Sequence, residues 1–105
     1  MGLDTTFFKT KRNDFIDGEK NIYDNNGDNK CGDKTIYYIR GNYEVLTYLH
    51  NRYKSKYNGN INETIIEIDN SDIIEISKLV NDELFIDKLT TPLNKGYIIY
   101  VECNY

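Results

Sequence analysis

The chain has 105 residues, a length that fits one domain with a small hydrophobic core, so we expect a single domain over residues 1–105. Apolar residues make up 39% of it, and the ten Tyr and four Phe exclude an intrinsically disordered chain. The net charge of −4 is uneven, because residues 57–105 hold nine acidic and three basic residues whereas residues 1–56 hold eight acidic and ten basic ones. An acidic half argues against broad affinity for nucleic acids, and it suits either docking on a basic protein surface or simple solubility.

Composition also indicates where the protein acts. The chain lacks Ala and Gln and is rich in Asn, Ile, Lys, Tyr and Asp, whose codons are AT-rich, which indicates a low-GC bacterium or its phage. It has no apolar leader and no apolar run of about 18 residues that would span a membrane, so we expect a cytoplasmic location in a bacterial cell. Cys31 and Cys103 could form one bridge in a secreted protein, but in the cytoplasm we expect two free thiols.

The first part of the chain is predicted to be a strand followed by a long loop. Thr and Phe residues favour a strand over residues 1–10, with Leu3, Thr5 and Phe7 on one face. Residues 11–33 are dense in Asn, Asp and Gly, and residues 25–28 form a strong turn signal. We therefore predict a loop, with a possible hairpin over residues 21–37.

This loop also contains a weak calcium-binding pattern. Asp24, Asn26 and Asp28 stand at the first, third and fifth positions of an EF-hand loop. The sixth and twelfth positions need Gly and Glu but hold Asn29 and Thr35, and helices on either side are missing from the pattern. The sequence therefore predicts a turn and no metal or cofactor site.

The clearest periodicity lies between residues 34 and 53. Residues 35–40 are β-branched and aromatic and predict a strand, and Asn42 follows as a helix N-cap. Over residues 43–54 the apolar side chains recur at helical spacing, which predicts a helix that buries Val45, Leu46, Leu49 and Tyr53.

The second half predicts a strand, a helix, a loop and a last strand. Residues 64–68 and 97–102 are rich in Ile, Val and Tyr and are the strands, and residues 90–96 are the loop. Residues 73–87 are predicted to be one helix with a buried stripe of Ile73, Ile76, Val80 and Leu84. Leu79 and Ile86 fall among the acidic residues of the opposite side, so this helix either is buried on two faces or presents apolar points among acids.

These elements predict an α+β fold. About four strands and two helices in mixed order are typical of a two-layer sandwich with both helices on one face of the sheet. An edge strand at either margin of that sheet could pair two copies of the chain, so the oligomeric state stays open.

The sequence contains no strong catalytic motif. His50 is the only histidine, and no serine or cysteine motif accompanies it, so we expect no catalytic residues and keep an enzyme with a site near His50 as an alternative. A second alternative is a single-strand nucleic-acid binder that uses the aromatic and basic residues of the first half. Its basic side chains would have to gather on one surface: Lys9, Lys11, Arg12, Arg40, Arg52, Lys54 and Lys56.

Protein recognition fits the pattern better. The polar side of the predicted 73–87 helix, together with Asp72 just before it, is acidic, and tyrosines off the stripe of the first helix supply contact area with a hydroxyl for specificity. The candidate partner-binding residues are Asp72, Glu75, Asp82, Glu83, Asp87, Tyr43 and Tyr48.

Three segments together resemble a group of small phage and prophage proteins of unknown function. They are residues 1–8, which open Met-Gly-Leu-Asp, residues 38–42 with the helix that follows, and residues 65–84. The long Asn/Asp insertion and the last strand depart from that group. The resemblance implies a phage protein that binds and blocks a host machine, and it carries no catalytic residue. We therefore expect a non-enzymatic, anti-CRISPR-like inhibitor of a bacterial defence effector, such as a CRISPR nuclease, that acts through its acidic surface.

Overall fold

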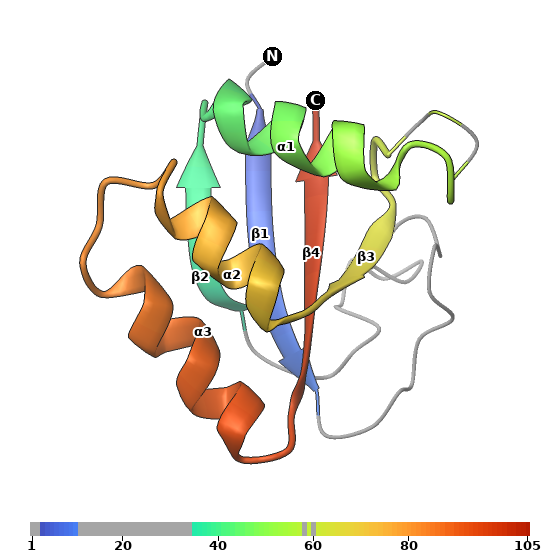
Figure 1. The fold of residues 1–105 in the computed structure, drawn as a ribbon. Coiled ribbons are helices and arrows are strands. Elements are labelled where there is room, and N and C mark those ends of the chain that lie inside the picture. The colour runs from blue at the N-terminus through green and yellow to red at the C-terminus, as the bar shows by residue number, and fades with distance from the viewer. Residues whose placement is uncertain (1–2, 11–34, 58, 60) are drawn as a thin grey trace, which may run out of the picture.

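A four-stranded antiparallel sheet forms one layer of the protein (Figure 1). The computed structural model describes residues 3–10, 35–57, 59 and 61–105. Strand order in the sheet is β2-β1-β4-β3, so the two central strands are the first and the last in the chain. Asp4 pairs with Asn104 across β1 and β4. The strands are β1 (Asp4–Thr10), β2 (Thr35–Arg40), β3 (Ile65–Ile68) and β4 (Ile98–Asn104).

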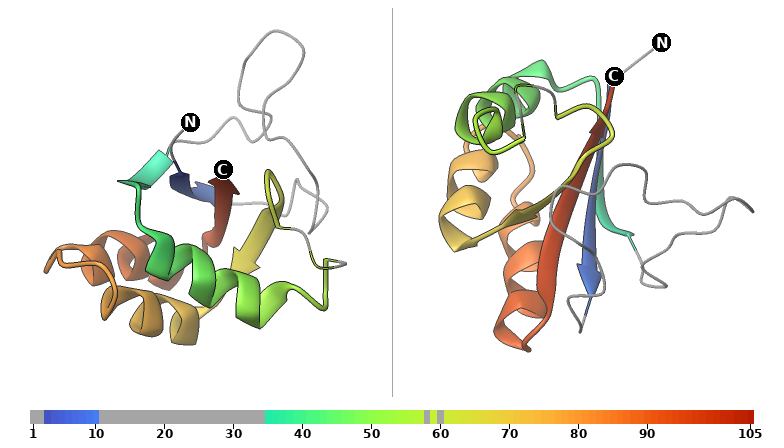
Figure 2. Two further views of the ribbon diagram at one scale, coloured as in Figure 1. Left: turned by 90° about the horizontal axis from the view of Figure 1, so that it is seen from above. Right: turned by 90° about the vertical axis from the view of Figure 1, so that its right-hand side faces the viewer.

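Three helices form the second layer, and Figure 2 shows them on one face of the sheet. They are α1 (Tyr43–Tyr53), α2 (Asn70–Ser77) and α3 (Phe85–Asn94). The predicted α+β two-layer fold is therefore confirmed, with three helices in place of the two expected. The strand at 35–40 and the helix that follows Asn42 also agree with the prediction.

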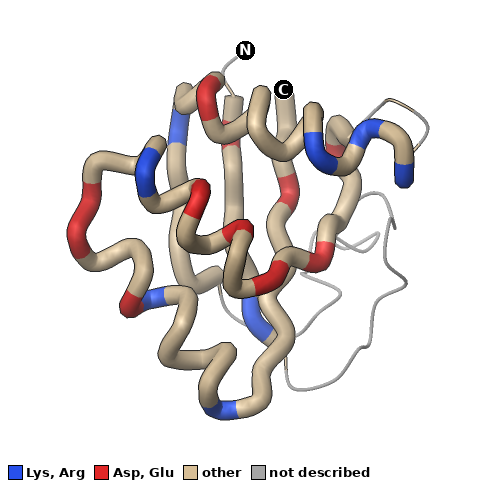
Figure 3. Tube along the Cα trace, in the orientation of Figure 1, with Lys and Arg blue, Asp and Glu red and all other residues tan. Residues whose placement is uncertain are grey.

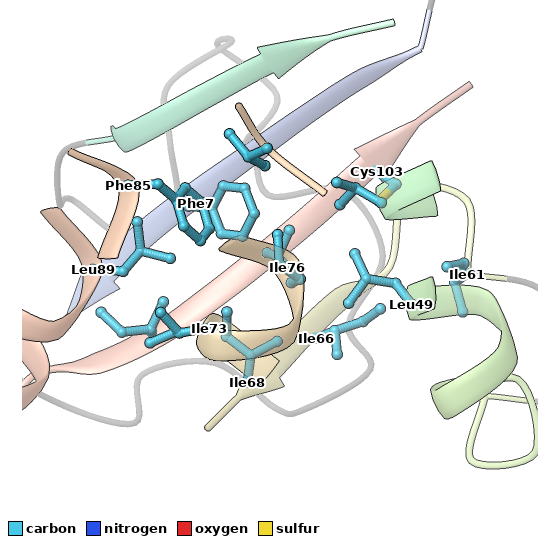
Figure 4. Packing of buried hydrophobic residues seen from close by; sticks show 14 of the residues in the cluster. Phe7, Leu49, Ile61, Ile66, Ile68, Ile73, Ile76, Phe85, Leu89 and Cys103 are labelled. Carbon is cyan, nitrogen blue, oxygen red and sulfur yellow. The ribbon is translucent and has the colours of Figure 1, made fainter. Parts of the chain in front are cut away.

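The core lies between the two layers (Figure 4). Leu3 and Phe7 share one face, as predicted, and that face packs against the helices together with Ile66 and Ile68 of β3. The helices bury their apolar stripes against these strands, with Leu49, Ile73, Ile76, Phe85 and Leu89 fully buried. On the other face of the sheet Phe8, Ile65 and Tyr100 form a smaller buried cluster.

The predicted single helix over residues 73–87 is wrong, because the chain turns between α2 and α3. Ile73, Ile76 and Val80 are buried as expected, but Leu84 is 57% exposed and Phe85 occupies the core instead. Phe85 lies edge-on between two aromatic rings of the sheet, with ring centroids 5.4 Å from Phe7 and 4.9 Å from Tyr37. This packing requires the chain to break its helical path before residue 85.

The predicted loop over residues 90–96 is also wrong in its first part. α3 continues to Asn94 and contains a buried Pro92, whose ring removes one helical hydrogen-bond donor. The helix ends at Asn94, and Gly96, two positions beyond, adopts φ +92°, a conformation that glycine reaches without steric strain.

Some predictions lie outside the described residues. These include the long loop over residues 11–33, its calcium-like residues Asp24, Asn26 and Asp28, and Cys31. Within the part of the chain that the structure describes, no helix combines the length and the apolar character that crossing a bilayer requires.

Candidate protein-binding surface

The N-terminus of α1 is held by Asn42, the predicted cap. Its Oδ1 atom accepts hydrogen bonds from the backbone N–H groups of Glu44 and Val45, each at 3.1 Å. Its Nδ2 atom donates to the carbonyl of Leu79 at 3.1 Å, just beyond the end of α2. One amide side chain therefore starts α1 and also ties it to α2.

A buried carboxylate ties the two helices together farther along. Asp72 has no exposed surface, and it accepts hydrogen bonds from the hydroxyls of Tyr48 at 2.7 Å and Tyr53 at 2.5 Å. Arg52 Nε lies 2.7 Å from the same carboxylate. Asp72 was predicted as a partner contact, and the structure instead buries this side chain, where it joins α2 to α1.

The position of Asp72 follows from the start of α2. Asp69 is the N-cap, and its Oδ1 atom accepts the backbone N–H of Asp72 at 3.0 Å, while Asp72 Oδ2 accepts the backbone N–H of Asp69 at 3.1 Å. This reciprocal capping box places residue 72 on the inner side of the first turn, facing α1. The hydrogen bond from the N–H of Asp72, followed by one from the Ser71 hydroxyl, lowers the pKa of Asp69.

The tyrosines around Asp72 are held in their neutral form. Burial, reinforced by the hydrogen bond to the carboxylate, raises the pKa of Tyr53 to about 12 and raises the pKa of Tyr48 as well. A neutral hydroxyl can donate to the carboxylate, whereas a phenolate would repel it. Tyr48 was predicted as a contact residue, and its hydroxyl is instead fixed within the protein while its ring lines a surface groove.

This groove lies between α1 and α2 and has a volume of about 550 Å³. It brings together three of the predicted contact residues, Tyr43, Tyr48 and Glu75, although they come from two helices. Tyr43 is the most open of them, with 60% of its surface exposed. The remaining lining residues are Glu44, Thr47, Asn51, Lys78 and Leu79.

The turn between α2 and α3 is the second candidate contact region. Asp82 fixes its shape, because the carboxylate accepts a hydrogen bond from the Tyr37 hydroxyl at 2.6 Å and another from the backbone N–H of Leu84 at 2.9 Å. The hydrogen bond from Tyr37, and to a smaller extent that from Leu84, lowers the pKa of Asp82. Asp82 was predicted as a contact residue, and the structure also gives it this role in holding the turn.

The turn presents apolar side chains among carboxylates. Leu84 and Ile86 are 57% and 40% exposed, and the side chains of Glu83 and Asp87 beside them are exposed as well. We call these four residues the α2–α3 edge. Lysines flank the acidic positions in this part of the fold (Figure 3), so the surface is mixed rather than uniformly acidic.

Sequence reasoning missed Leu84, because the 3.6-residue period placed it in the buried stripe. The position of the apolar Ile86 among acidic residues did indicate this surface. Its exposure supports the interpretation that the segment presents apolar side chains among acidic ones, rather than being buried on two faces. The contacts of Asn42 with Leu79, of Arg52 with Asp72 and of Tyr37 with Asp82 join residues twenty or more positions apart, which periodicity does not reveal.

His50 hydrogen bonds to the backbone rather than to a candidate nucleophile. Its Nε2 atom lies 3.2 Å from the carbonyl of Gly59, in the segment that follows α1. No group of three or more His, Cys, Asp and Glu side chains that could hold a metal ion occurs among the described residues.

The basic residues of the first half do not gather where the structure describes them. Arg40 ends β2 beside the start of α1, whereas Arg52 and Lys54 stand at the other end of that helix, about 16 Å away for eleven residues. Lys9 lies near the end of β1 that is remote from Arg40, since Asp4 is the residue paired with Arg40. Lys11 and Arg12 lie outside the described residues.

Comparisons of the chain with protein-family models, with curated proteins and with solved structures find no match.

Proposed function

We propose that this protein is a non-enzymatic binding domain that docks on a basic surface of a bacterial protein through the α2–α3 edge. The observation that carries the proposal is the exposure of Leu84 and Ile86 between Glu83 and Asp87, where the turn fixed by Asp82 leads into α3. Because Asp82 fixes the backbone of the turn, little backbone entropy is lost on binding, so the apolar side chains there are suited to act as anchors. The carboxylates around them favour a partner with basic groups at the rim of an apolar hollow.

The partner we propose is a bacterial defence effector, such as a CRISPR nuclease, which the protein would block in the cytoplasm of the host. Nucleases carry basic channels for nucleic acid, and an acidic domain is attracted to such a channel. The preference for amino acids with AT-rich codons and the resemblance to small phage proteins support this choice of partner.

The test is capture and inhibition by variants of the full chain. We expect Glu83→Lys with Asp87→Lys to abolish capture of the partner from a low-GC bacterial lysate and to restore DNA cleavage by the captured nuclease. Asp82 is left intact, because its loss would release the turn as well as remove a charge.

The matched control is Glu63→Lys with Glu67→Lys, which changes the net charge by the same amount at two exposed positions in and before β3. It should retain capture and inhibition. If both double variants bind equally well, the α2–α3 edge is not the docking surface. If both lose binding equally, net charge rather than this edge governs it, and the proposal also fails.

A further inference from the structure

The groove lies between α1 and α2, the two helices labelled in Figure 1, and hydrogen bonds link these helices near both of its ends. At one end Asn42 donates to the carbonyl of Leu79 at 3.1 Å. At the other end the hydroxyls of Tyr48 and Tyr53 donate to the buried Asp72. These cross-links fix the spacing of the helices, so the groove is preformed and a ligand has little reorganisation to drive.

The lining of the groove combines apolar walls with carboxylates. Tyr43, the ring of Tyr48 and Leu79 supply the apolar area, and Glu44 and Glu75 supply two negative charges. Lys78 Nζ lies 3.4 Å from Glu75, in an exposed pair of the kind that contributes little and rearranges readily. The three charged side chains leave the groove with one net negative charge, which a single cationic group would neutralise.

This chemistry selects among cations. An exposed tyrosine ring beside carboxylates suits the planar guanidinium of arginine, which stacks on aromatic rings and donates two parallel hydrogen bonds to a carboxylate. The ammonium group of lysine is more strongly hydrated, and it does not donate two parallel hydrogen bonds to one carboxylate. A phosphate or other anion would meet the two carboxylates and be repelled.

We infer that the α1–α2 groove accepts an arginine side chain, flanked by apolar residues, from a protein partner. The inference rests on the proposed function only in taking a protein as the source of the arginine. It adds a second contact point, and it assigns roles to residues that the α2–α3 edge does not use: Glu44 and Glu75 as the anion pair and Tyr43 as the stacking surface.

The test is an NMR titration of the full, isotope-labelled chain with acetyl-Leu-Arg-Leu-amide and with the same peptide carrying citrulline, which is neutral and nearly the same shape. We expect saturable shifts at backbone amides of residues 43–51 and 75–79 in the millimolar range, with the citrulline peptide weaker by about five- to ten-fold. Glu44→Gln with Glu75→Gln should weaken the arginine peptide by a similar factor. Glu63→Gln with Glu67→Gln should leave its affinity unchanged.

Three results would overturn the inference: equal affinity for the two peptides, no perturbation of the groove amides in the millimolar range, or equal weakening by the two double variants. Shifts at the same amides that depend on protein concentration without peptide would show that a second copy, with Arg40 exposed, fills the groove, and would likewise exclude a foreign arginine. The titration is independent of partner capture. If the arginine peptide does not bind but the α2–α3 edge variants behave as expected in partner capture, only the groove proposal fails. If the peptide binds but the edge variants do not behave as expected, only the α2–α3 edge proposal fails.

Discussion

Replacing Asp72 with Ala should separate α1 from α2 and destabilise the whole protein. The carboxylate is fully buried and accepts hydrogen bonds from the hydroxyls of Tyr48 and Tyr53 and from the backbone N–H of Asp69, at 2.7, 2.5 and 3.1 Å. It also forms an ion pair with Arg52 at 2.7 Å. Hydrogen bonds to a charged group are worth about 1.5–3 kcal/mol each, so a simple sum for three donors is roughly 5–9 kcal/mol.

That sum is an upper bound, because the donors can regain water. Arg52 is 44% exposed and both tyrosines are only partly buried, so each can be hydrated once the carboxylate is gone. We therefore expect a loss of about 3–4 kcal/mol in the free energy of unfolding, similar to the cost of breaking other buried charge pairs. For a domain of this size the loss lowers the melting midpoint by about 15 °C.

Urea denaturation followed by circular dichroism measures this loss, with Glu75→Ala as the control. Glu75 lies on the same helix with its side chain 51% exposed, so its removal should change the free energy of unfolding by no more than about 0.5 kcal/mol. A double-mutant cycle with Arg52→Ala should return a coupling of about 1 kcal/mol for the partly exposed ion pair. A loss below about 1 kcal/mol for Asp72→Ala would refute the view that this carboxylate joins the helices.

Three further outcomes follow from the same structure. Burial and the neighbouring carboxylates raise the pKa of Tyr37 and of Tyr53 to about 12, above the unfolded value of about 10. Their contribution to stability is therefore complete below about pH 10 and falls as the pH rises toward 12. Urea denaturation across this pH range should show the fall, and Tyr37→Phe should make it smaller. Burial raises the pKa of the Cys103 thiol to about 12, so in a Cys31→Ser variant iodoacetamide should modify it only after unfolding, and rapid native modification would contradict its burial. Partner affinity should fall only modestly between low and physiological salt, because Leu84 and Ile86 anchor the contact; a loss of about a thousand-fold would instead indicate a phosphate mimic.

The elements that the sequence predicts well are those specified by neighbouring residues. The strand at residues 35–40 follows from its β-branched and aromatic residues, and α1 follows from its apolar period and from Asn42, whose cap bonds reach only two and three positions along the chain. The α+β class follows from the order of these elements. Such signals are short-range, so a single sequence contains them in full.

The break between α2 and α3 could not be read in the same way. Residues 78–84 contain no Gly or Pro, and the spacing of Ile73, Ile76 and Val80 continues smoothly to Leu84. What decides the break is the hydrogen bond from Tyr37 to Asp82, 45 positions apart, and the place that the sheet offers to Phe85 between two rings. Pro92 led to the opposite error, the prediction of a loop where the structure has a helix, because burial holds Pro92 within α3 despite its low helix propensity.

The acidic residues of the second half divide into two groups, and this division changes what kind of partner the protein can bind. Asp69, Asp72 and Asp82 direct their carboxylates to backbone N–H groups and tyrosine hydroxyls, where they start helices and hold the turn. Glu75, Glu83 and Asp87 form the second group, which is exposed and starts no helix, and lysines stand near its members (Figure 3). Lys78 and Lys88 therefore offset part of the negative charge on the helical layer, and Leu84 and Ile86 stand exposed between Glu83 and Asp87. A partner that offers charge alone, such as a channel shaped only for phosphates, would leave these apolar side chains in water, whereas a protein surface with an apolar hollow and a basic rim would bury them and neutralise the carboxylates together.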